Sequence, residues 1–258
     1  MSDFWILRPM GPLLWAMIGA SLLILAIVSI LLRNTSQRTK AWVVSIVCWI
    51  TLIGFFVYKY YLSIDPEYNV LRADMGGFNW WGEFPLHLCN INLLLMPIAV
   101  LTKKRPLMSF CFFLGPLGAL MALLMPGTGF SDCSIFLPRM LGYFGTHLIV
   151  FVAALAIGTF GLYRPQMKDL LPLIGTIFIV SLVIFGFNML LRTTGLYPNS
   201  NYFYNVETEG NAILEIFYRW IPIPFLYELP SVLILVPYAA LITLLFRLFG
   251  KEKDSQEA

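Results

Sequence analysis

The chain has 258 residues, of which 59% are hydrophobic and 12% are charged, and its formal net charge is +3. This composition excludes a water-soluble globular domain and predicts an all-α fold, a polytopic bundle of transmembrane helices. The slight excess of positive charge gives no reason to expect a nucleic-acid partner, so membrane lipids are the expected partners.

Seven apolar runs are long enough to cross a bilayer whose hydrocarbon core is about 30 Å thick. In chain order they cover residues 12–32, 41–62, 84–102, 107–126, 137–161, 170–191 and 226–249. The basic turn from Lys103 to Pro106 predicts that the third and fourth runs form an antiparallel hairpin. We therefore expect one seven-helix transmembrane domain over residues 1–250 and a polar cytoplasmic tail over residues 251–258.

The positions of Lys and Arg predict the orientation, because these residues are retained on the cytoplasmic side. Most of the 17 basic residues fall on one side of the seven runs: Arg33, Arg38, Lys40, Lys103, Lys104, Arg105, Arg164, Lys168, Arg247, Lys251 and Lys253. The others fall on the opposite side: Arg8, Lys59, Arg72, Arg139, Arg192 and Arg219. We therefore expect the N-terminus outside, the C-terminus in the cytoplasm, and the chain in the cell membrane.

The third run opens with an unusual set of polar residues, in "FPLHLCNINLLLMPIAVL". Cys89 lies near the expected start of a helix, and both a helix N-terminus and a nearby histidine favour the thiolate, so Cys89 is a candidate nucleophile. In a regular helix His87 would point about 200° away from Cys89, which makes it a poor base. His147, from the fifth run, is the better candidate, because an ionisable side chain inside a membrane span is a functional hypothesis by default. A structural hydrogen bond is the alternative for both histidines.

Other polar residues on the outer side suggest a binding site around this pair. Asn90, Asn92 or Asn188 could donate hydrogen bonds to a carbonyl oxygen that becomes negative. Arg139 or Arg192 could bind a phosphate, with His87 as a further candidate. The aromatic residues between the sixth and seventh runs, including "NYFYN", are typical of an interfacial belt, and a lid over a lipid-facing cavity is the alternative.

The motifs "FPLHLCNINLLLMPIAVLT", "FFLGPLGALMALLMP" and "TGLYPNSNYFYN" resemble the YwaF-like family of bacterial seven-span membrane proteins. The resemblance runs from about the first span to the seventh, and the Pro-Leu-His-Leu-Cys segment is its most specific part. That family is similar to a eukaryotic group of transmembrane acyltransferases that act on phospholipids. The resemblance implies that Cys89 and His147 are the residues that carry the activity.

The leading hypothesis is a membrane-embedded acyl-transfer enzyme, a phospholipid or lysolipid acyltransferase or transacylase. Cys89 would attack a lipid ester in the outer leaflet and His147 would move the proton. A transporter is an alternative, but the polar residues crowd one side, whereas a pathway needs polarity right through. A non-enzymatic scaffold with a lipid-binding cavity is the other alternative.

The four cysteines show no paired spacing, so no disulfide framework is expected, and neither a cofactor nor a metal ion is expected. The sequence carries no signal of oligomeric state.

Overall fold

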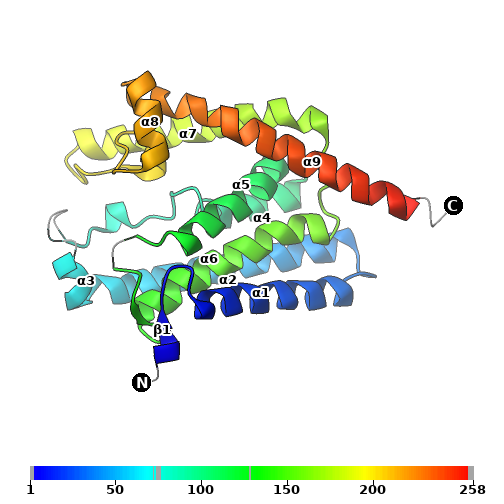
Figure 1. Ribbon diagram of the computed structural model, residues 1–258, viewed down its shortest axis with the longest axis horizontal. Helices are drawn as coiled ribbons and strands as arrows, with labels where there is room; N and C mark the ends of the chain where they lie inside the picture. Colours follow the sequence, from blue (N-terminus) through cyan, green and yellow to red (C-terminus); the bar gives the residue numbers. More distant parts are fainter. Residues whose placement is uncertain (1–2, 72, 74–76, 128, 255–258) are drawn as a thin grey trace. The chain divides into compact units, whose positions relative to one another are not determined.

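The computed structural model describes residues 3–71, 73, 77–127 and 129–254 (Figure 1). Within these residues the fold is helical apart from one short antiparallel pair of strands, β1 (Ile6–Leu7) and β2 (Cys133–Ser134). The chain divides into two compact units. The first unit contains Met1–Lys104 and Cys111–Leu162, and the second contains Arg105–Phe110 and Tyr163–Ala258.

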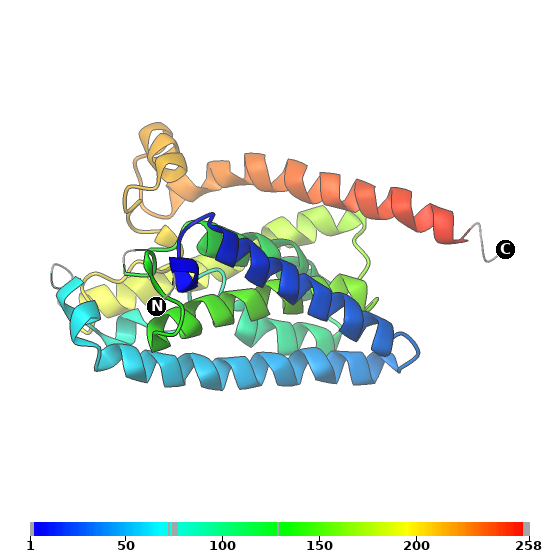
Figure 2. The ribbon, with the colours of Figure 1, turned by 60° about the horizontal axis from the view of Figure 1, so that its bottom comes forward.

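The first unit is built around helix α6, which contacts α1, α2 and α4. Helices α1 and α2 lie beside it, joined to each other by a short turn (Figure 2). More than half of the membrane-length stretch of α6 is buried, 56%, against 17% for α1, so α6 is an inner helix and α1 an outer one. In chain order the helices of this unit, with η for a 3-10 helix, are η1 (Asp3–Trp5), α1 (Pro12–Leu31), α2 (Gln37–Ser63), α3 (Pro66–Leu71), η3 (Trp80–Gly82), α4 (Asn92–Thr102), the greater part of α5 (Arg105–Leu124) and α6 (Pro138–Thr159).

Local sequence explains where these helices start and how closely they approach. Pro12 and Pro138 occupy the first positions of α1 and α6, where the missing N–H costs no helical hydrogen bond. Ser36 caps α2, since its hydroxyl accepts a hydrogen bond from the Thr39 N–H at 3.1 Å. Gly142 of α6 leaves no room for a β-carbon beside the Tyr58 side chain, and this allows α6 and α2 to pack closely.

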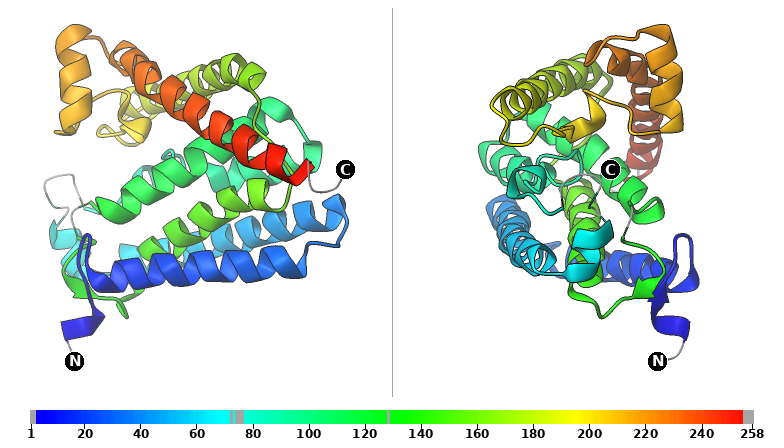
Figure 3. Two further views of the ribbon diagram at one scale, coloured as in Figure 1. Left: turned by 45° about the vertical axis from the view of Figure 1, so that its right-hand side comes forward. Right: turned by 90° about the vertical axis from the view of Figure 1, so that its left-hand side faces the viewer.

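The second unit contains two long helices, α7 and α9, that contact each other, and the short helix α8. Helix α8 is steeply inclined to both long helices (Figure 3). Its elements in chain order are η4 (Met167–Asp169), α7 (Leu170–Thr193), η5 (Tyr202–Tyr204), α8 (Ala212–Trp220), η6 (Leu226–Ser231) and α9 (Val232–Asp254). The predicted tail over residues 251–258 begins inside α9, and residues 255–258 lie outside the described residues, as does Arg72.

Six helices are long and apolar enough to cross a membrane, so the chain is a multi-pass membrane protein. They cover Pro12–Leu31, Gln37–Ser63, Arg105–Leu124, Pro138–Thr159, Met167–Thr193 and Leu226–Leu248. The predicted third span, residues 84–102, is helical only over Asn92–Thr102, and residues 85–91 form consecutive turns. Pro85 disfavours helical backbone at the residue before it, and asparagine side chains compete for backbone hydrogen bonds, which explains the late start of α4.

Candidate active site

Cys89 and His147 lie side by side in the first unit. The Cys89 Sγ atom is 3.2 Å from Nε2 of His147. The other ring nitrogen, Nδ1, is 2.7 Å from the carbonyl oxygen of Tyr143, one turn earlier in α6. A carbonyl can only accept a hydrogen bond, so Nδ1 carries the proton of the neutral ring and Nε2 presents its lone pair to the thiol. The pair therefore has the geometry of a thiol hydrogen-bonded to a base.

The turns before α4 bring Cys89 to this position. The Ile91 N–H donates to the His87 carbonyl at 2.9 Å, and the Leu93 N–H donates to the Asn90 carbonyl at 2.9 Å. The first bond closes one turn of the α-helical type and the second a tighter turn, and the regular helix begins only at Asn92. His87 is half-buried in the same turns.

A glycine in α5 allows this segment to sit deep in the first unit. A β-carbon on Gly115 would lie 2.6 Å from the Ala154 β-carbon and 3.4 Å from Oδ1 of Asn92. The first distance is impossible without a shift of α6 or α5. Gly115 thus lets α5 pack against α6 and against the start of α4 at once, and this explains the glycine in the "GPLGAL" run.

Two asparagines beside Cys89 are buried and only partly hydrogen-bonded. Asn90 is 7% exposed, and its Oδ1 atom has no hydrogen-bond partner. Asn92 is fully buried; its Nδ2 group donates to the Leu88 carbonyl at 2.8 Å, while its Oδ1 atom has no partner. Buried amide oxygens without partners are uncommon in folded proteins.

His147 is 3% exposed and lies against the aromatic ring of Tyr143. The Tyr143 ring lies 4.3 Å from the imidazole and stacks on Phe130 at 4.4 Å. The Tyr143 hydroxyl donates to the Ala122 carbonyl at 3.0 Å, which fixes the ring. This apolar wall holds the imidazole in place against the thiol.

A buried ion pair near the site was not predicted from the sequence. Lys59 of α2 pairs with Glu83, and their side chains are only 9% and 11% exposed. The Tyr68 hydroxyl donates to the second oxygen of Glu83 at 3.1 Å, and the Lys59 ammonium lies 4.7 Å from the Tyr58 ring. The charge of Lys59 lies within electrostatic range of both Cys89 and His147. The sequence signal that could have indicated this ion pair is the position of Lys59 inside an apolar run.

Arg139 lies at the start of α6, in an ion-pair cluster of its own. It is 2% exposed, and its guanidinium binds Asp65 at 2.8 Å and Glu67 at 2.8 Å. Partial burial acts to raise the pKa of Asp65, but the N–H of Tyr68 and the Arg139 guanidinium outweigh it and hold this pKa below its ordinary value. Two carboxylates thus occupy the guanidinium that was predicted to bind a phosphate.

Asn188 and Arg192 belong to the second unit, where they hold the chain that follows α7. The Asn188 amide donates to the Tyr202 carbonyl at 2.9 Å and to Oδ1 of Asn205 at 2.7 Å. Its oxygen accepts from the Ser200 hydroxyl at 2.7 Å and from the Tyr202 N–H at 2.9 Å. Arg192 donates to the Ser200 carbonyl at 2.7 Å and pairs with Glu207 at 2.8 Å.

The site residues thus form three groups: Cys89, His147, Asn90 and Asn92 around the thiol, Arg139 with its carboxylates, and Asn188 with Arg192 in the second unit. Among the described residues there is no group of three or more histidine, cysteine, aspartate or glutamate side chains arranged to hold a metal ion.

Comparison with curated proteins and with solved structures found no match to this chain. A family model does match, and it covers residues 9–247, which include every candidate site residue. A match over nearly the whole length shows the family, so the chain belongs to the TMEM164 family.

Proposed function

We propose that this protein is a membrane acyl-transfer enzyme that acts on lipid esters through Cys89 and His147. The observation that supports the proposal most directly is the 3.2 Å contact between Cys89 Sγ and His147 Nε2, in the tautomer that a general base requires. The resemblance of the Cys89 motif to transmembrane phospholipid acyltransferases points to the same chemistry.

The proposed reaction has two halves. In the first, His147 Nε2 takes the thiol proton while Cys89 Sγ attacks the ester carbonyl; the carbon–oxygen bond breaks, and the leaving alcohol takes the proton from Nε2. In the second, the hydroxyl of a lysolipid or of water gives its proton to Nε2 and attacks the thioester, which releases the Cys89 thiol. Nδ1 keeps its proton throughout and donates it in a hydrogen bond to the Tyr143 carbonyl, and this contact steadies the positively charged ring between the two halves.

The carbonyl oxygen needs hydrogen-bond donors as it becomes negative. Asn90 is the best-placed candidate, because it follows Cys89 directly and its side chain makes no hydrogen bond within the described residues. The Asn92 amide already donates to the Leu88 carbonyl, so we assign Asn92 to holding the turn. The head-group roles of His87, Arg139 and Arg192 stay predictions.

The proposed site lies in the outer leaflet of the cell membrane. This follows from seven crossings, with the N-terminus outside and the C-terminus in the cytoplasm. In this scheme α4, which has only 11 residues, completes the third crossing together with the turns before it. Accessibility mapping that placed the Lys103–Pro106 turn outside would overturn the scheme.

The test uses the full chain in nanodiscs that contain phosphatidylcholine and an isotope-labelled lysophospholipid. The wild type should transfer acyl groups to the labelled lysolipid, and rapid quenching should reveal an acyl adduct on Cys89 by mass spectrometry. Cys89→Ala should abolish both signals and keep the melting temperature within a few degrees, because the change removes little packing volume.

Cys133→Ala is the matched control, because Cys133 is also half-buried and lies against a polar group, Arg139, at 3.6 Å. This variant should keep both the adduct and the transfer. Transfer that persists in Cys89→Ala, or an adduct on another residue, would show that Cys89 is not the nucleophile.

A further inference from the structure

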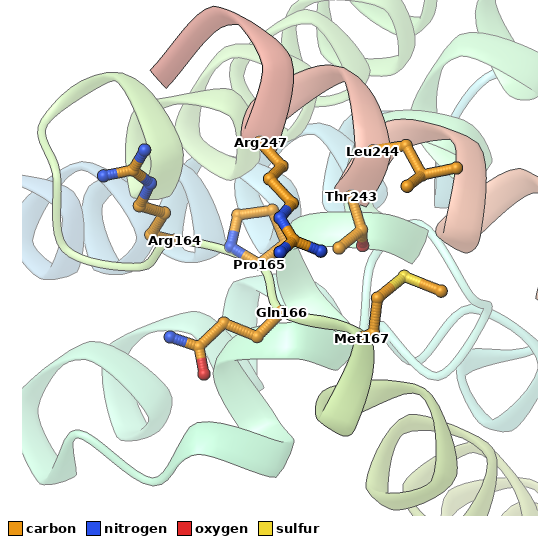
Figure 4. A pocket seen from close by; sticks show the side chains of 7 residues that line it. All are labelled: Arg164, Pro165, Gln166, Met167, Thr243, Leu244 and Arg247. Atoms are coloured by element: carbon orange, nitrogen blue, oxygen red, sulfur yellow. The ribbon is translucent and has the colours of Figure 1, made fainter. Parts of the chain in front are cut away.

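The second unit contains a pocket that the acyl-transfer proposal does not use. Its volume is about 410 Å³ (Figure 4). One wall is the connection that leads into α7, residues 164–167, and the other is the last part of α9, with Thr243, Leu244 and Arg247. Two arginines, Arg164 and Arg247, are the charged residues of the lining, and no carboxylate belongs to it. The pocket therefore carries a local charge of two positive units.

Neither arginine is neutralised by another described side chain. Among the side chains that the structure describes, no ion pair or side-chain hydrogen bond involves Arg164 or Arg247. In Figure 4 the Arg247 side chain points toward the connection at Pro165, whereas the Arg164 side chain points away from the other lining residues. Arg164 is exposed, so its side chain can turn toward a ligand without breaking a contact.

The neighbouring Arg105, in contrast, is paired with a carboxylate. Arg105 forms a two-fold contact with Asp169, from Nε to Oδ1 at 2.6 Å and from Nη2 to Oδ2 at 2.7 Å. The charge of Arg105 is thus balanced by a carboxylate, whereas Arg164 and Arg247 keep their charge available for an anion from outside the chain.

The same carboxylate fixes the wall of the pocket. Asp169 Oδ2 accepts hydrogen bonds from the Tyr163 hydroxyl and the Gln166 N–H, both at 2.8 Å. Arg105 also donates to the Arg164 carbonyl at 2.9 Å. The backbone from Tyr163 to Gln166 is therefore held in one conformation before any ligand binds, which lowers the entropy cost of binding.

The membrane-crossing stretches define the depth of this pocket. One of them begins at Met167 and another ends at Leu248, so the pocket lies where two crossings meet the bilayer surface. The phosphates of lipid headgroups lie at this depth. Met167 and Leu244 add half-exposed apolar surface beside the arginines, at 44% and 45% exposure. This combination suits an anion that carries an apolar tail.

We propose that the pocket formed by residues 164–167 and by Thr243, Leu244 and Arg247 binds the phosphate group of a phospholipid headgroup. Arg247 contacts the phosphate oxygens from inside the pocket and Arg164 closes over them, since guanidinium matches phosphate in two parallel hydrogen bonds. Met167 and Leu244 contact the apolar part of the lipid. This proposal does not depend on the acyl-transfer activity, and its test measures binding alone.

The test is native mass spectrometry of the detergent-solubilised full chain, titrated with dihexanoyl phosphatidylglycerol. The wild type should bind one molecule in a saturable way. The double variant Arg164→Gln with Arg247→Gln should raise Kd by about 10- to 100-fold, the loss expected for charge-assisted hydrogen bonds. The matched control, Arg38→Gln with Arg219→Gln, removes two positive charges outside the pocket lining and should raise Kd by less than about twofold. Equal loss in the two double variants, or none in the first, would overturn the proposal.

Inorganic phosphate is the second ligand to be tested, because it carries the phosphate group of the phospholipid but lacks the apolar tail. Lipid that binds much more tightly than phosphate supports a headgroup site. Equal binding of the two would leave free phosphate as the ligand and overturn the lipid assignment. Should the double glutamine variant fail to purify, Arg247→Lys keeps the charge but not the planar fork, and it should still raise Kd by about threefold or more. An unchanged Kd in that variant would also overturn the proposal.

Discussion

The two clusters of buried asparagines differ in how completely their side chains are hydrogen-bonded. Around Asn188, in the second unit, the amide nitrogen donates twice and the oxygen accepts twice. Around Cys89, in the first unit, Asn90 and Asn92 are just as buried, yet neither side-chain oxygen has a partner. A saturated network holds a fold together, whereas unsatisfied groups beside a thiol and an imidazole are free to meet a ligand.

The free-energy cost of leaving buried amide oxygens without a hydrogen-bond partner supports this interpretation. A buried polar atom without a partner costs about 1–3 kcal/mol, and an apolar side chain of similar size would avoid that cost. The chain nevertheless has Asn90 directly after its candidate nucleophile. The unpartnered Asn90 oxygen can accept a hydrogen bond from a hydroxyl that enters the site, and the Nδ2 group of the same side chain can donate to a carbonyl oxygen beside Cys89.

The largest expected effect is on the rate, through His147. His147→Gln keeps a polar side chain of similar length but removes the proton relay. The rate of acyl-adduct formation on Cys89 should fall by about 10²–10⁴-fold, and the variant should lose the pH dependence that a titrating base imposes on this rate. Rapid-quench mass spectrometry of the adduct, over a range of pH, measures both quantities.

A structural role for His147 gives the opposite pattern. In that case the glutamine variant would keep the wild-type pH profile and would lose thermal stability instead. His87, which is half-buried in the turns before α4, would then become the candidate base again.

The next largest expected effect is on stability, through Asn188 in the fully hydrogen-bonded asparagine cluster. Asn188→Ala leaves the Ser200 hydroxyl, both backbone groups of Tyr202 and the Asn205 side chain short of a partner. The free energy of unfolding should fall by about 3 kcal/mol or more. Thermal melting of the purified protein measures the loss.

Asn90→Ala is the matched change in the other cluster, and the two variants should behave oppositely. Because the Asn90 oxygen has no partner to lose, the melting temperature should stay level or rise. The acyl-transfer rate should fall by about 10²-fold if its amide stabilises the oxyanion. A stable Asn188→Ala or an unstable Asn90→Ala would remove the distinction between the two clusters.

The sequence predicted the helical membrane fold and all six long helices to within about four residues at each end, because long apolar runs in a chain this hydrophobic have one solution in a bilayer. The largest difference is at residues 84–91. Hydropathy extends the helix through this polar segment, but Pro85 and the asparagines favour turns, and periodicity alone does not weigh those local preferences.

Contacts between distant residues were the hardest part of the site to predict. The depth of Cys89 and His147 in their spans allowed contact, but the 3.2 Å separation depends on the packing of α5, α6 and the turns, which Gly115 permits. The carboxylates that bind Arg139 lie about seventy residues earlier in the chain, so its ion pairs could not be foreseen from local pattern. The pairing of Lys59 with Glu83 was missed for the same reason.

The smallest expected effect concerns that Arg139 cluster, through the pH dependence of stability. The folded-state pKa of Asp65 lies below its ordinary value, so the group stabilises the fold above its ordinary pKa, and this contribution is lost as pH falls through the folded pKa.

Asp65→Asn keeps an oxygen that can accept from the Tyr68 N–H but removes the charge beside Arg139. At pH 7 the variant should lose about 1 kcal/mol, since Asp65 is partly exposed and Glu67 still binds the guanidinium. Once the pH has fallen through the folded-state pKa of Asp65 and the wild-type carboxylate is protonated, the melting temperatures of the two proteins should converge. Asp132→Asn is the control, because its contact with Arg8 is long, 3.9 Å, and both side chains are exposed; it should follow the wild type at every pH. A gap between wild type and Asp65→Asn that stays constant as the pH falls from 7 through the folded-state pKa of Asp65 would show that the charge of Asp65 contributes nothing to the cluster.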